Sequence, residues 1–504
     1  MGIHSKTKRK SSSTFRAGVW LAVILPLLTA CGGGGGGGAA PVDSTVIEQT
    51  GSSALVPAAT TTTTATATST SSFNVAEISS GPAAALDVDI NKFGTAVAVW
   101  VDASWGRGIT WSNRFENGGW GTPVQVSTSN ETAAPRIAIN SQGDAIAVWE
   151  DRHYVSTLSN GTDVTVWVSR YAGGAWTAPT QVSAWVTHGQ TAPVVEIDDA
   201  GRAMVAWRQE DPTSSVPSVW QAAYDGSMWS APKRLSDGIH EVWQFELELE
   251  MNAAGDGVAA WVQHTNNFDE PGYEGYAVPN MWAANYVGGE WGAASRIGDP
   301  TLVKDDMCSS VDLAMNEGGR VVATCSQRKG GVRSIVMNTF EPGLPGSWSA
   351  APSVVTALPD TEYHLAHAVA LANDGGVLVG LTASQPSTMD RIVSVHRYDD
   401  ASASWAQPLQ FSGDVNSRAF VEYDGAGTGY VIWDEAESFA GWHMHRFSPS
   451  TGWDAKQRLP VPFMSGDDIH FAVAGNGYGV MVFDKSKSVP DGFEDWAGAF
   501  TWPY

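Results

Sequence analysis

The chain has 504 residues with 53 acidic against 29 basic side chains, a formal net charge of −24 at pH 7. This acidic balance argues against a nucleic-acid partner, because a surface that binds nucleic acid must neutralise phosphates with Lys and Arg. The chain has three cysteines and no Cys-x-x-Cys pair, which argues against catalytic redox chemistry.

Residues 1–30 have the pattern of a bacterial signal peptide. Five basic residues lie before or at the start of an apolar stretch, 19–30, that is shorter than the roughly 20 residues a membrane-spanning helix needs. The stretch ends in Leu28-Thr29-Ala30-Cys31, which resembles a lipobox. The resemblance implies cleavage before Cys31 and lipidation of that cysteine; the alternative is an ordinary secretory signal. Gly32 stands where Asp would imply inner-membrane retention, so we expect an outer-membrane lipoprotein.

Residues 31–72 are expected to form a flexible tether that begins at the lipidated cysteine. Residues 32–38 are all Gly, and 59–72 are almost entirely Thr, Ala and Ser. A segment of this composition cannot bury a hydrophobic core. We therefore expect residues 73–504 to be the folded domain.

Residues 73–504 repeat one pattern eight times. In the clearest copy, two apolar strands at 137–140 and 145–149 precede a third strand with Trp167 and a turn that ends in Trp176. Radial repetition of four-stranded sheets is the plan of a β-propeller. We predict an all-β chain with eight four-stranded blades, and seven blades is the alternative.

The ends of the repeat array are complementary. The last copy has three recognisable strands, the third at 496–500, and the segment 73–78 resembles a fourth strand. This N-terminal strand is predicted to complete the last blade, which would close the ring and remove an exposed sheet edge.

Cys308 and Cys325 flank one predicted hairpin. Cys325 takes the place that Trp149 has in the clearest copy. In an oxidising envelope we expect a disulfide between the two cysteines, worth about 3 kcal/mol for a loop of this size.

The spacing of the repeated tryptophans separates two faces of the predicted ring. Third-strand Trp and turn Trp are nine residues apart in four copies, whereas second-strand Trp and third-strand Trp are eleven to twenty-one apart. Constant turns indicate scaffold, and variable loops are where binding residues usually lie. We call the side with the second-to-third-strand loops and the blade-to-blade connections the variable face.

Aromatic residues outside the repeat are the first candidates for ligand binding. Four tryptophans do not fit the repeat: Trp105, Trp185, Trp243 and Trp502. The first three are predicted to lie on the variable face. Exposed indoles there would stack on a sugar ring or clamp a peptide. Packing within the loops is an equal alternative.

Acidic residues follow the second strand in several copies, including Asp102, Asp151, Asp211 and Asp434. They would form a broken acidic ring that binds a cation or a cationic partner, but solvated strand ends are the favoured interpretation. The sequence has no calcium-loop spacing and no other cofactor motif, so no cofactor is evident. Calcium stays open only because the acidic ring would suit a cation.

Residues at the blade starts are expected to point towards the axis. Two of them, Arg136 and Arg418, are candidates for binding an acidic group. The others are Asp or His, which would suit a metal or acid–base chemistry but lack diagnostic spacing: His188, His240, Asp305, Asp306, His364, His367, Asp467, Asp468 and His470.

The copies at 137–182 and 194–235 resemble the sialidase-like (BNR-repeat-like) propellers of bacterial surface proteins. The sialidase Asp-box is not met, and the segment 224–229 is only a loose echo of it. Sialidases hold a carboxylate with three arginines, and this chain offers Arg136 and Arg418 without a clear third. The resemblance therefore supports the fold and carries over no catalytic residue.

We expect a monomeric, lipid-anchored envelope propeller that binds a glycan or an envelope protein through its variable face, without catalysis. One alternative is a glycan hydrolase or lyase that uses Asp305, Asp467, His364 or His470. A second alternative is a scaffold for outer-membrane assembly, although the chain lacks the repeat motif of the known eight-bladed lipoprotein.

Overall fold

A computed structural model describes residues 74–102, 108–154, 162–183, 191–265, 277–343, 346–358, 365–384, 391–413, 419–435, 441–459, 469–489 and 492–502. The predicted signal and tether, with Cys31, lie outside these residues. So do Trp105, Trp185 and Arg418, together with His188, His364, Asp467 and Asp468.

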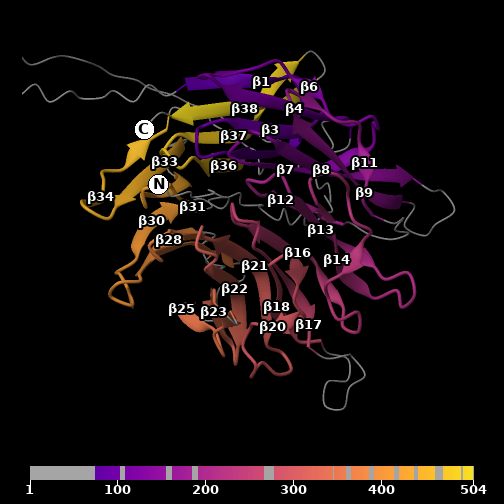
Figure 1. Cartoon of the computed structure of the whole chain (residues 1–504). Helices are drawn as coiled ribbons and strands as arrows, with labels where there is room; N and C mark the ends of the chain where they lie inside the picture. The colour runs from indigo at the N-terminus through magenta and orange to yellow at the C-terminus, as the bar shows by residue number, and fades with distance from the viewer. Residues whose placement is uncertain are drawn as a thin grey trace, which may run out of the picture. The chain divides into compact units, whose positions relative to one another are not determined.

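The described residues form eight antiparallel sheets, which are the eight predicted blades (Figure 1). Blade 1 contains β2 (Ala84–Ile90), β3 (Ala96–Val101), β4 (Thr110–Glu116), β5 (Gly119–Trp120) and β6 (Val124–Gln125). Blade 2 contains β7 (Thr132–Ile139), β8 (Ala145–Tyr154), β9 (Thr162–Ala172), β10 (Ala175–Trp176) and β11 (Thr180–Gln181). Blade 3 contains β12 (Val194–Ile197), β13 (Ala203–Glu210), β14 (Pro217–Tyr224) and β15 (Lys233–Arg234). Blade 4 contains β16 (Val242–Met251), β17 (Gly257–His264), β18 (Pro279–Val287), β19 (Glu290–Trp291) and β20 (Ser295–Arg296).

The remaining blades repeat this order. Blade 5 contains β21 (Met307–Met315), β22 (Val321–Lys329), β23 (Val332–Glu341), β24 (Ser347–Trp348) and β25 (Ser353–Leu358). Blade 6 contains β26 (Leu365–Leu371), β27 (Val377–Ser384), β28 (Arg391–Asp399), β29 (Ser404–Trp405) and β30 (Leu409–Gly413). Blade 7 contains β31 (Phe420–Tyr423), β32 (Gly429–Glu435), β33 (Gly441–Ser448), β34 (Gly452–Trp453) and β35 (Gln457–Arg458). Blade 8 contains β36 (Ile469–Val473), β37 (Gly479–Val489), β38 (Gly492–Trp502) and β1 (Asn74–Pro82).

The outermost strand of a typical blade is split into two short pieces that both pair with the third strand. In blade 1, β5 and β6 both pair with β4 and are separated by Gly121, Thr122 and Pro123. Pro123 has no backbone N–H to donate to a ladder, so the pairing is interrupted there. The split pieces together make the fourth strand that the sequence predicts.

The N-terminal strand closes the ring, as predicted. β1 pairs antiparallel with β38, with Asn74 opposite Thr501 and Val75 opposite Phe500, and the first strand lies beside the last in Figure 1. The third strand of blade 8 is longer than expected and reaches Trp502. That indole is 3 % exposed and packs near Tyr430 of blade 7, so Trp502 joins the core between blades.

The hydrophobic core lies between neighbouring blades. The second-strand tryptophans Trp100, Trp149, Trp207, Trp261 and Trp433 are each at most 2 % exposed. Each core cluster draws its residues chiefly from two adjacent blades, and the cluster around Trp100 joins blade 1 to blade 8. Each buried indole removes about 150–250 Å² from water, so these seams hold the ring together.

The disulfide that the sequence predicts is present. Cys308 on β21 and Cys325 on β22 are bonded, with their Cα atoms 5.9 Å apart. Both sulfurs lie in a core cluster with Val311 and Val336, at the seam between blades 4 and 5. The cross-link therefore fills the space that a second-strand Trp fills in other blades.

Candidate functional site

The predicted acidic residues at the ends of the second strands form hydrogen bonds close to their own loops. Asp102 accepts bonds from the backbone N–H of Ile109 at 2.6 Å and from the indole of Trp111 at 3.1 Å. Asp151 is 5 % exposed and accepts a bond from the hydroxyl of Ser129 at 2.8 Å. These two carboxylates organise the connections around them, and the buried Asp151 is not the solvated strand end that the sequence pattern favours.

Asp211 is the most extensively bonded of these carboxylates. Its Oδ1 accepts bonds from the hydroxyl of Thr213 at 2.5 Å and from the backbone of Thr213 and Ser214, and its Oδ2 accepts one from Arg234 at 2.5 Å. The bonds from Thr213, followed by those from Ser214 and Arg234, hold the pKa of Asp211 far below its usual range. Asp434, at the end of β32, is half-buried.

The predicted axial residues that the structure describes are scattered along the seams. Arg136 on β7 donates to the carbonyl of Pro135 at 3.0 Å. His470 of blade 8 lies 3.3 Å from the buried carboxylate of Asp87 in blade 1, and both are almost fully buried. Trp243 on β16 is 37 % exposed, as expected of a surface indole. Among the described residues, no group of three or more His, Cys, Asp or Glu is arranged to hold a metal ion.

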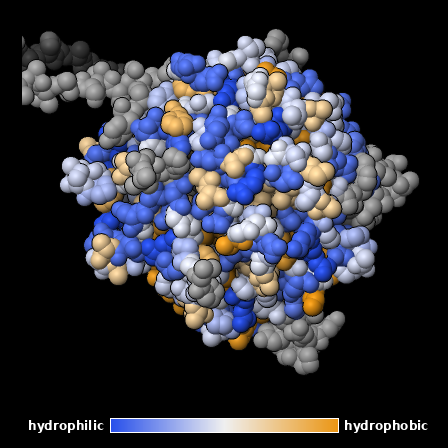
Figure 2. All heavy atoms as spheres, viewed as in Figure 1, coloured by the Kyte–Doolittle hydropathy of each residue, from blue (hydrophilic) through white to orange (hydrophobic). Residues whose placement is uncertain are grey.

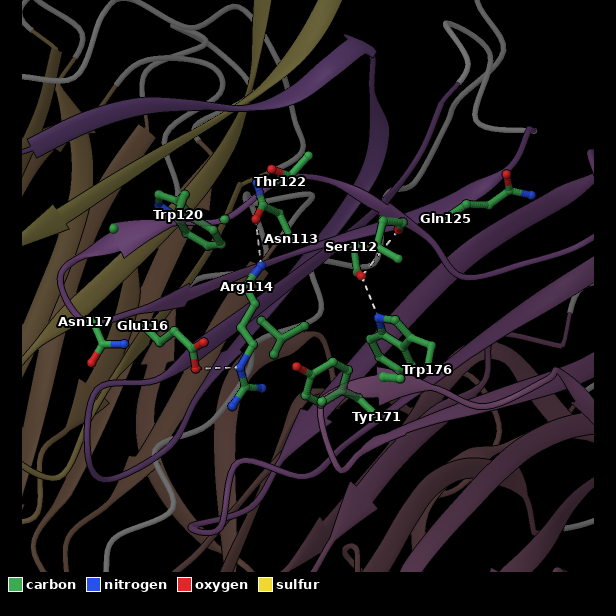
Figure 3. A pocket seen from close by; sticks show the side chains of 16 residues that line it. Ser112, Asn113, Arg114, Glu116, Asn117, Trp120, Thr122, Gln125, Tyr171 and Trp176 are labelled. Atoms are coloured by element: carbon green, nitrogen blue, oxygen red, sulfur yellow. Dashed lines mark hydrogen bonds and ion pairs between the residues drawn. The ribbon is translucent and has the colours of Figure 1, made fainter.

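The structure contains a groove that sequence reasoning missed, between the outer strands of blades 1 and 2. Its volume is about 720 Å³. β4, β5 and β6 form one wall, the β9–β10 turn forms the other, and Val97 of β3 lies among the lining residues. Figure 3 shows the residues that line this space, which come from both blades.

Two turn tryptophans are among the residues that line the groove, and their indoles pack in different seams. Trp176 packs against the cluster between blades 1 and 2, and Trp120 packs against the cluster between blades 8 and 1. Trp176 donates from Nε1 to the hydroxyl of Ser112 at 2.9 Å, which ties blade 2 to blade 1 (Figure 3). Trp120 is half-buried, and its Nε1 has no hydrogen-bond partner among the described residues. Each indole packs against a third-strand ring of its own blade, Phe115 or Tyr171, at a centroid distance of 5.5 Å.

Charged and amide groups complete the lining. The Nε of Arg114 donates to Glu116 at 3.1 Å (Figure 3). Its Nη1 donates to the carbonyl of Gly143 at 2.9 Å. Its guanidinium lies 4.8 Å from the centre of the Tyr171 ring, a cation–π contact across the seam. Glu116 and Asn117, at the exposed turn, leave polar groups facing solvent at the rim of the groove.

The groove combines flat apolar walls with a polar rim. Pockets that bind small organic ligands have this composition, with aromatic side chains and a few polar groups that fix orientation. The surface in Figure 2 is mostly hydrophilic, with apolar residues scattered in small groups. The described chain has no helix that is long and apolar enough to cross a bilayer. The groove is therefore the candidate site that the described residues offer for a ligand.

No family model and no curated protein matches this sequence. Among solved structures, the polysaccharide lyase Uly1 aligns over 84 % of this chain and 90 % of its own, with 9 % identity and a TM-score of 0.48. An α-L-arabinanase of Penicillium chrysogenum aligns over 66 % of this chain and 99 % of its own, with 12 % identity and a TM-score of 0.35. NanB in complex with Optactamide aligns over 81 % and 83 %, with 9 % identity and a TM-score of 0.32. Similarities this low say nothing about the activity of this chain.

Proposed function

We propose that this chain is a lipid-anchored protein of the bacterial cell envelope that binds a glycan through the groove between blades 1 and 2. The observation that carries the proposal is the indole of Trp176 in a groove of about 720 Å³ with a polar rim, with Trp120 among the lining residues. A sugar ring has an apolar face that stacks on indole and a belt of hydroxyls that bonds to polar side chains. The groove supplies both kinds of contact.

The polar groups at the groove suit neutral hydroxyls better than a cation or a peptide backbone. Arg114 and Glu116 neutralise each other, so the groove has little net field of its own. Asn117 and Gln125 add amide groups near the edge. Paired charges and amides both donate and accept hydrogen bonds, which is what a polyhydroxylated ligand requires.

The test is a glycan array with the purified full-length protein, followed by titration of each hit. Gly119 lines the groove, and a Cβ placed on it meets no atom within 4 Å. Gly119→Trp should therefore fill the groove without disturbing the blades and should reduce binding at least tenfold, about 1.4 kcal/mol. Trp176→Ala should also abolish binding.

The repeat provides a matched control for the loss of a turn indole. Trp291 of blade 4 packs on Tyr286 at 5.4 Å, much as Trp176 packs on Tyr171, and it does not line this groove. The Nε1 of Trp291 has no hydrogen-bond partner among the described residues, so Trp291→Ala should lower stability by less than Trp176→Ala and should leave glycan binding intact. Equal binding of a neutral glycan by the wild type and Gly119→Trp would refute the groove as the site. Absence of any array hit would move the function to a protein partner.

The variable face is the other location for a ligand. Trp185→Ala and Trp243→Ala test it, because they change predicted variable-face residues and leave the groove lining intact. Loss of neutral-glycan binding in these variants, with Gly119→Trp unaffected, would place that ligand on the variable face.

The lipid anchor is a separate part of the proposal and rests on the lipobox pattern that ends at Cys31. Cys31→Ser should move the protein from the membrane fraction to the soluble fraction and abolish incorporation of labelled palmitate. Cell fractionation of the wild type should find it in the outer membrane. A wild-type protein without lipid, cleaved as an ordinary secretory protein, would refute this part.

A further inference from the structure

A second cluster of functional groups lies at the variable-face end of the seam between blades 3 and 4. It contains Arg208 near the end of β13, Glu241 directly before β16, Trp243 on β16 and His264 at the end of β17. β13 and β16 are in contact and lie next to each other in Figure 1. The cluster is separate from the groove between blades 1 and 2 and from the glycan-binding function proposed for it.

Arg208 is a buried cation whose charge is poorly compensated. Its side chain is 8 % exposed, and its Nε donates to the carbonyl of Val242 at 3.0 Å. Its Nη2 lies 3.9 Å from the nearest oxygen of Glu241, beyond hydrogen-bonding distance, and neither terminal nitrogen has a hydrogen bond to another described residue. A buried guanidinium of this kind favours an anion that accepts bonds from both terminal nitrogens.

The pKa of Arg208 reflects this environment. Burial lowers the pKa of the guanidinium, and the negative charges of Glu241 and Glu210 raise it by a smaller amount. Arginine stays protonated in proteins, so Arg208 keeps its charge in spite of the cost of burial. An anion closer than Glu241 would stabilise that charge.

Glu241 is held loosely at the same point. Its side chain is 44 % exposed, and its carboxylate lies 3.9 Å from Arg208 and 4.0 Å from Nδ1 of His264. The carboxylate makes no hydrogen bond within the described part of the chain. Because it is solvated and not bonded to either neighbour, it can swing away and leave Arg208 to an incoming oxyanion.

Trp243 gives the cluster an aromatic wall. The indole is 37 % exposed and contacts the imidazole of His264 edge-on, with ring centroids 6.0 Å apart. An edge-on contact leaves the faces of the indole uncovered by His264. Burial lowers the pKa of His264, so its ring is neutral at pH 7 and adds no charge to the site.

We propose that this cluster binds an acidic sugar residue, a uronate, with its carboxylate on the terminal nitrogens of Arg208 and its ring against Trp243. The guanidinium supplies planar, bidentate recognition of a carboxylate, and the indole supplies the apolar contact that a free inorganic anion lacks. The net charge of −24 opposes a polyanion at long range. At physiological ionic strength this repulsion is screened beyond about 8 Å. For a short ligand, the attraction between Arg208 and the carboxylate therefore dominates.

The test compares two probes that differ in one group, methyl β-glucuronide and methyl β-glucoside, titrated against the full-length protein by NMR. The glucuronide should bind at least about tenfold more tightly than the glucoside, because only the glucuronide pairs with Arg208. Inorganic phosphate should compete weakly, since it lacks a ring for Trp243. Equal binding of the two sugars would overturn the proposal, and so would phosphate binding as tightly as the glucuronide.

Three variants assign the contacts. Arg208→Met should abolish glucuronide binding, and Trp243→Ala should weaken it at least about fivefold. Glu241→Gln should tighten it at least about threefold, because the competing carboxylate is removed. Tightening is a result that general damage to the fold does not produce. If Arg208→Met does not fold, the exposed positions Trp243 and Glu241 still decide the matter, and weaker binding by Glu241→Gln would contradict the proposal.

The controls lie on other parts of the ring. Phe93 is 68 % exposed at the turn between β2 and β3, so Phe93→Ala should leave glucuronide binding unchanged. Gly119→Trp, which fills the groove, should also leave it unchanged. Failure of glucuronide binding therefore bears on this cluster alone and leaves the groove proposal standing.

Discussion

The side-chain amide of Asn91 donates a hydrogen bond of 3.1 Å to the carbonyl oxygen of Asn140 in the next blade. Asn140 occupies the same turn position one blade further on and donates at 3.0 Å to the carbonyl of Asp198. Asn252 and Asn316 make the equivalent bonds to the blades that follow them. A chain of turn-to-turn contacts thus links the inner hairpins on the face opposite the variable loops.

Asn140→Ala should destabilise the fold. The variant loses two bonds that Oδ1 accepts, from the N–H groups of Gln142 and Asp144, and the bond to the next blade. Leaving such buried groups unsatisfied costs about 1–3 kcal/mol. Urea denaturation measures the loss. Asn140→Asp keeps the two accepted bonds and loses only the bond to the next blade, so it should cost less than Ala. An equal cost would show that the two accepted bonds contribute nothing and that the bond between blades accounts for the whole loss.

Asp424→Asn should stabilise the fold at neutral pH. Asp424 holds the same turn position, accepts bonds from Ala426 and Thr428, and has a pKa that burial raises. Asn keeps those bonds without a buried charge, and replacements of this consensus type give about 0.5–2 kcal/mol.

The pH dependence of the Asp424→Asn effect follows from the direction of the pKa shift. A raised pKa means that the folded state holds the proton more tightly than the unfolded chain, whose Asp pKa is about 3.9. As the pH rises from the unfolded-state pKa to the higher folded-state pKa, ionisation of Asp424 costs stability. Below the unfolded-state pKa this cost is absent. The advantage of the Asp424→Asn variant over the wild type should shrink towards pH 4 in urea titrations, and a constant advantage would contradict the account.

Loss of the disulfide should lower stability by about 3 kcal/mol, because the bond between Cys308 and Cys325 restricts the unfolded chain. The double variant Cys308→Ala/Cys325→Ala should show the loss in thermal unfolding. A reductant should lower the melting temperature of the wild type and leave the double variant unchanged. Sensitivity of the double variant to reductant would mean that the effect arises elsewhere.

Removal of β1 should expose the edge of β38 and cause self-association. A chain that starts at residue 84 lacks β1, including the buried Ile78, whereas a chain that starts at residue 73 keeps it. An unpaired edge strand is a template for pairing with another molecule. Sedimentation velocity should show concentration-dependent oligomers for the shorter chain and a monomer for the longer one. Two monomers would mean that β1 is dispensable for closure.

Most of the fold could be predicted from the sequence because the repeat is internal and periodic. Eight copies gave eight blades, and the unmatched strands at the two ends gave the closure by β1. Trp502 was placed outside the pattern because the other copies have Phe or Tyr at its position. The register shows the equivalence, since Trp502 lies opposite Gly479 as Tyr171 lies opposite Ala145. Its contact with Tyr430 of the neighbouring blade is not contained in a single sequence.

The candidate sites were harder to predict because they lie between repeats. Trp120 and Trp176 lie in the constant turns that the sequence pattern assigns to the scaffold, and each packs on a ring of its own blade. The groove is lined by residues of two blades, which no spacing within one repeat predicts. Arg208 and Glu241 belong to different blades and have no motif spacing. Trp243 could be identified as a candidate because it does not fit the repeat. In a periodic sequence, residues that depart from the pattern are the useful guide to candidate sites.

The closing strand also sets an order in time. β1 leaves the ribosome before every other strand of the ring, and its partner β38 leaves after them. Throughout synthesis, the first strand has no native neighbour and must stay unpaired while seven blades form. A chaperone that holds this segment would prevent pairing with the wrong blade, and completion of the ring becomes the last step of maturation.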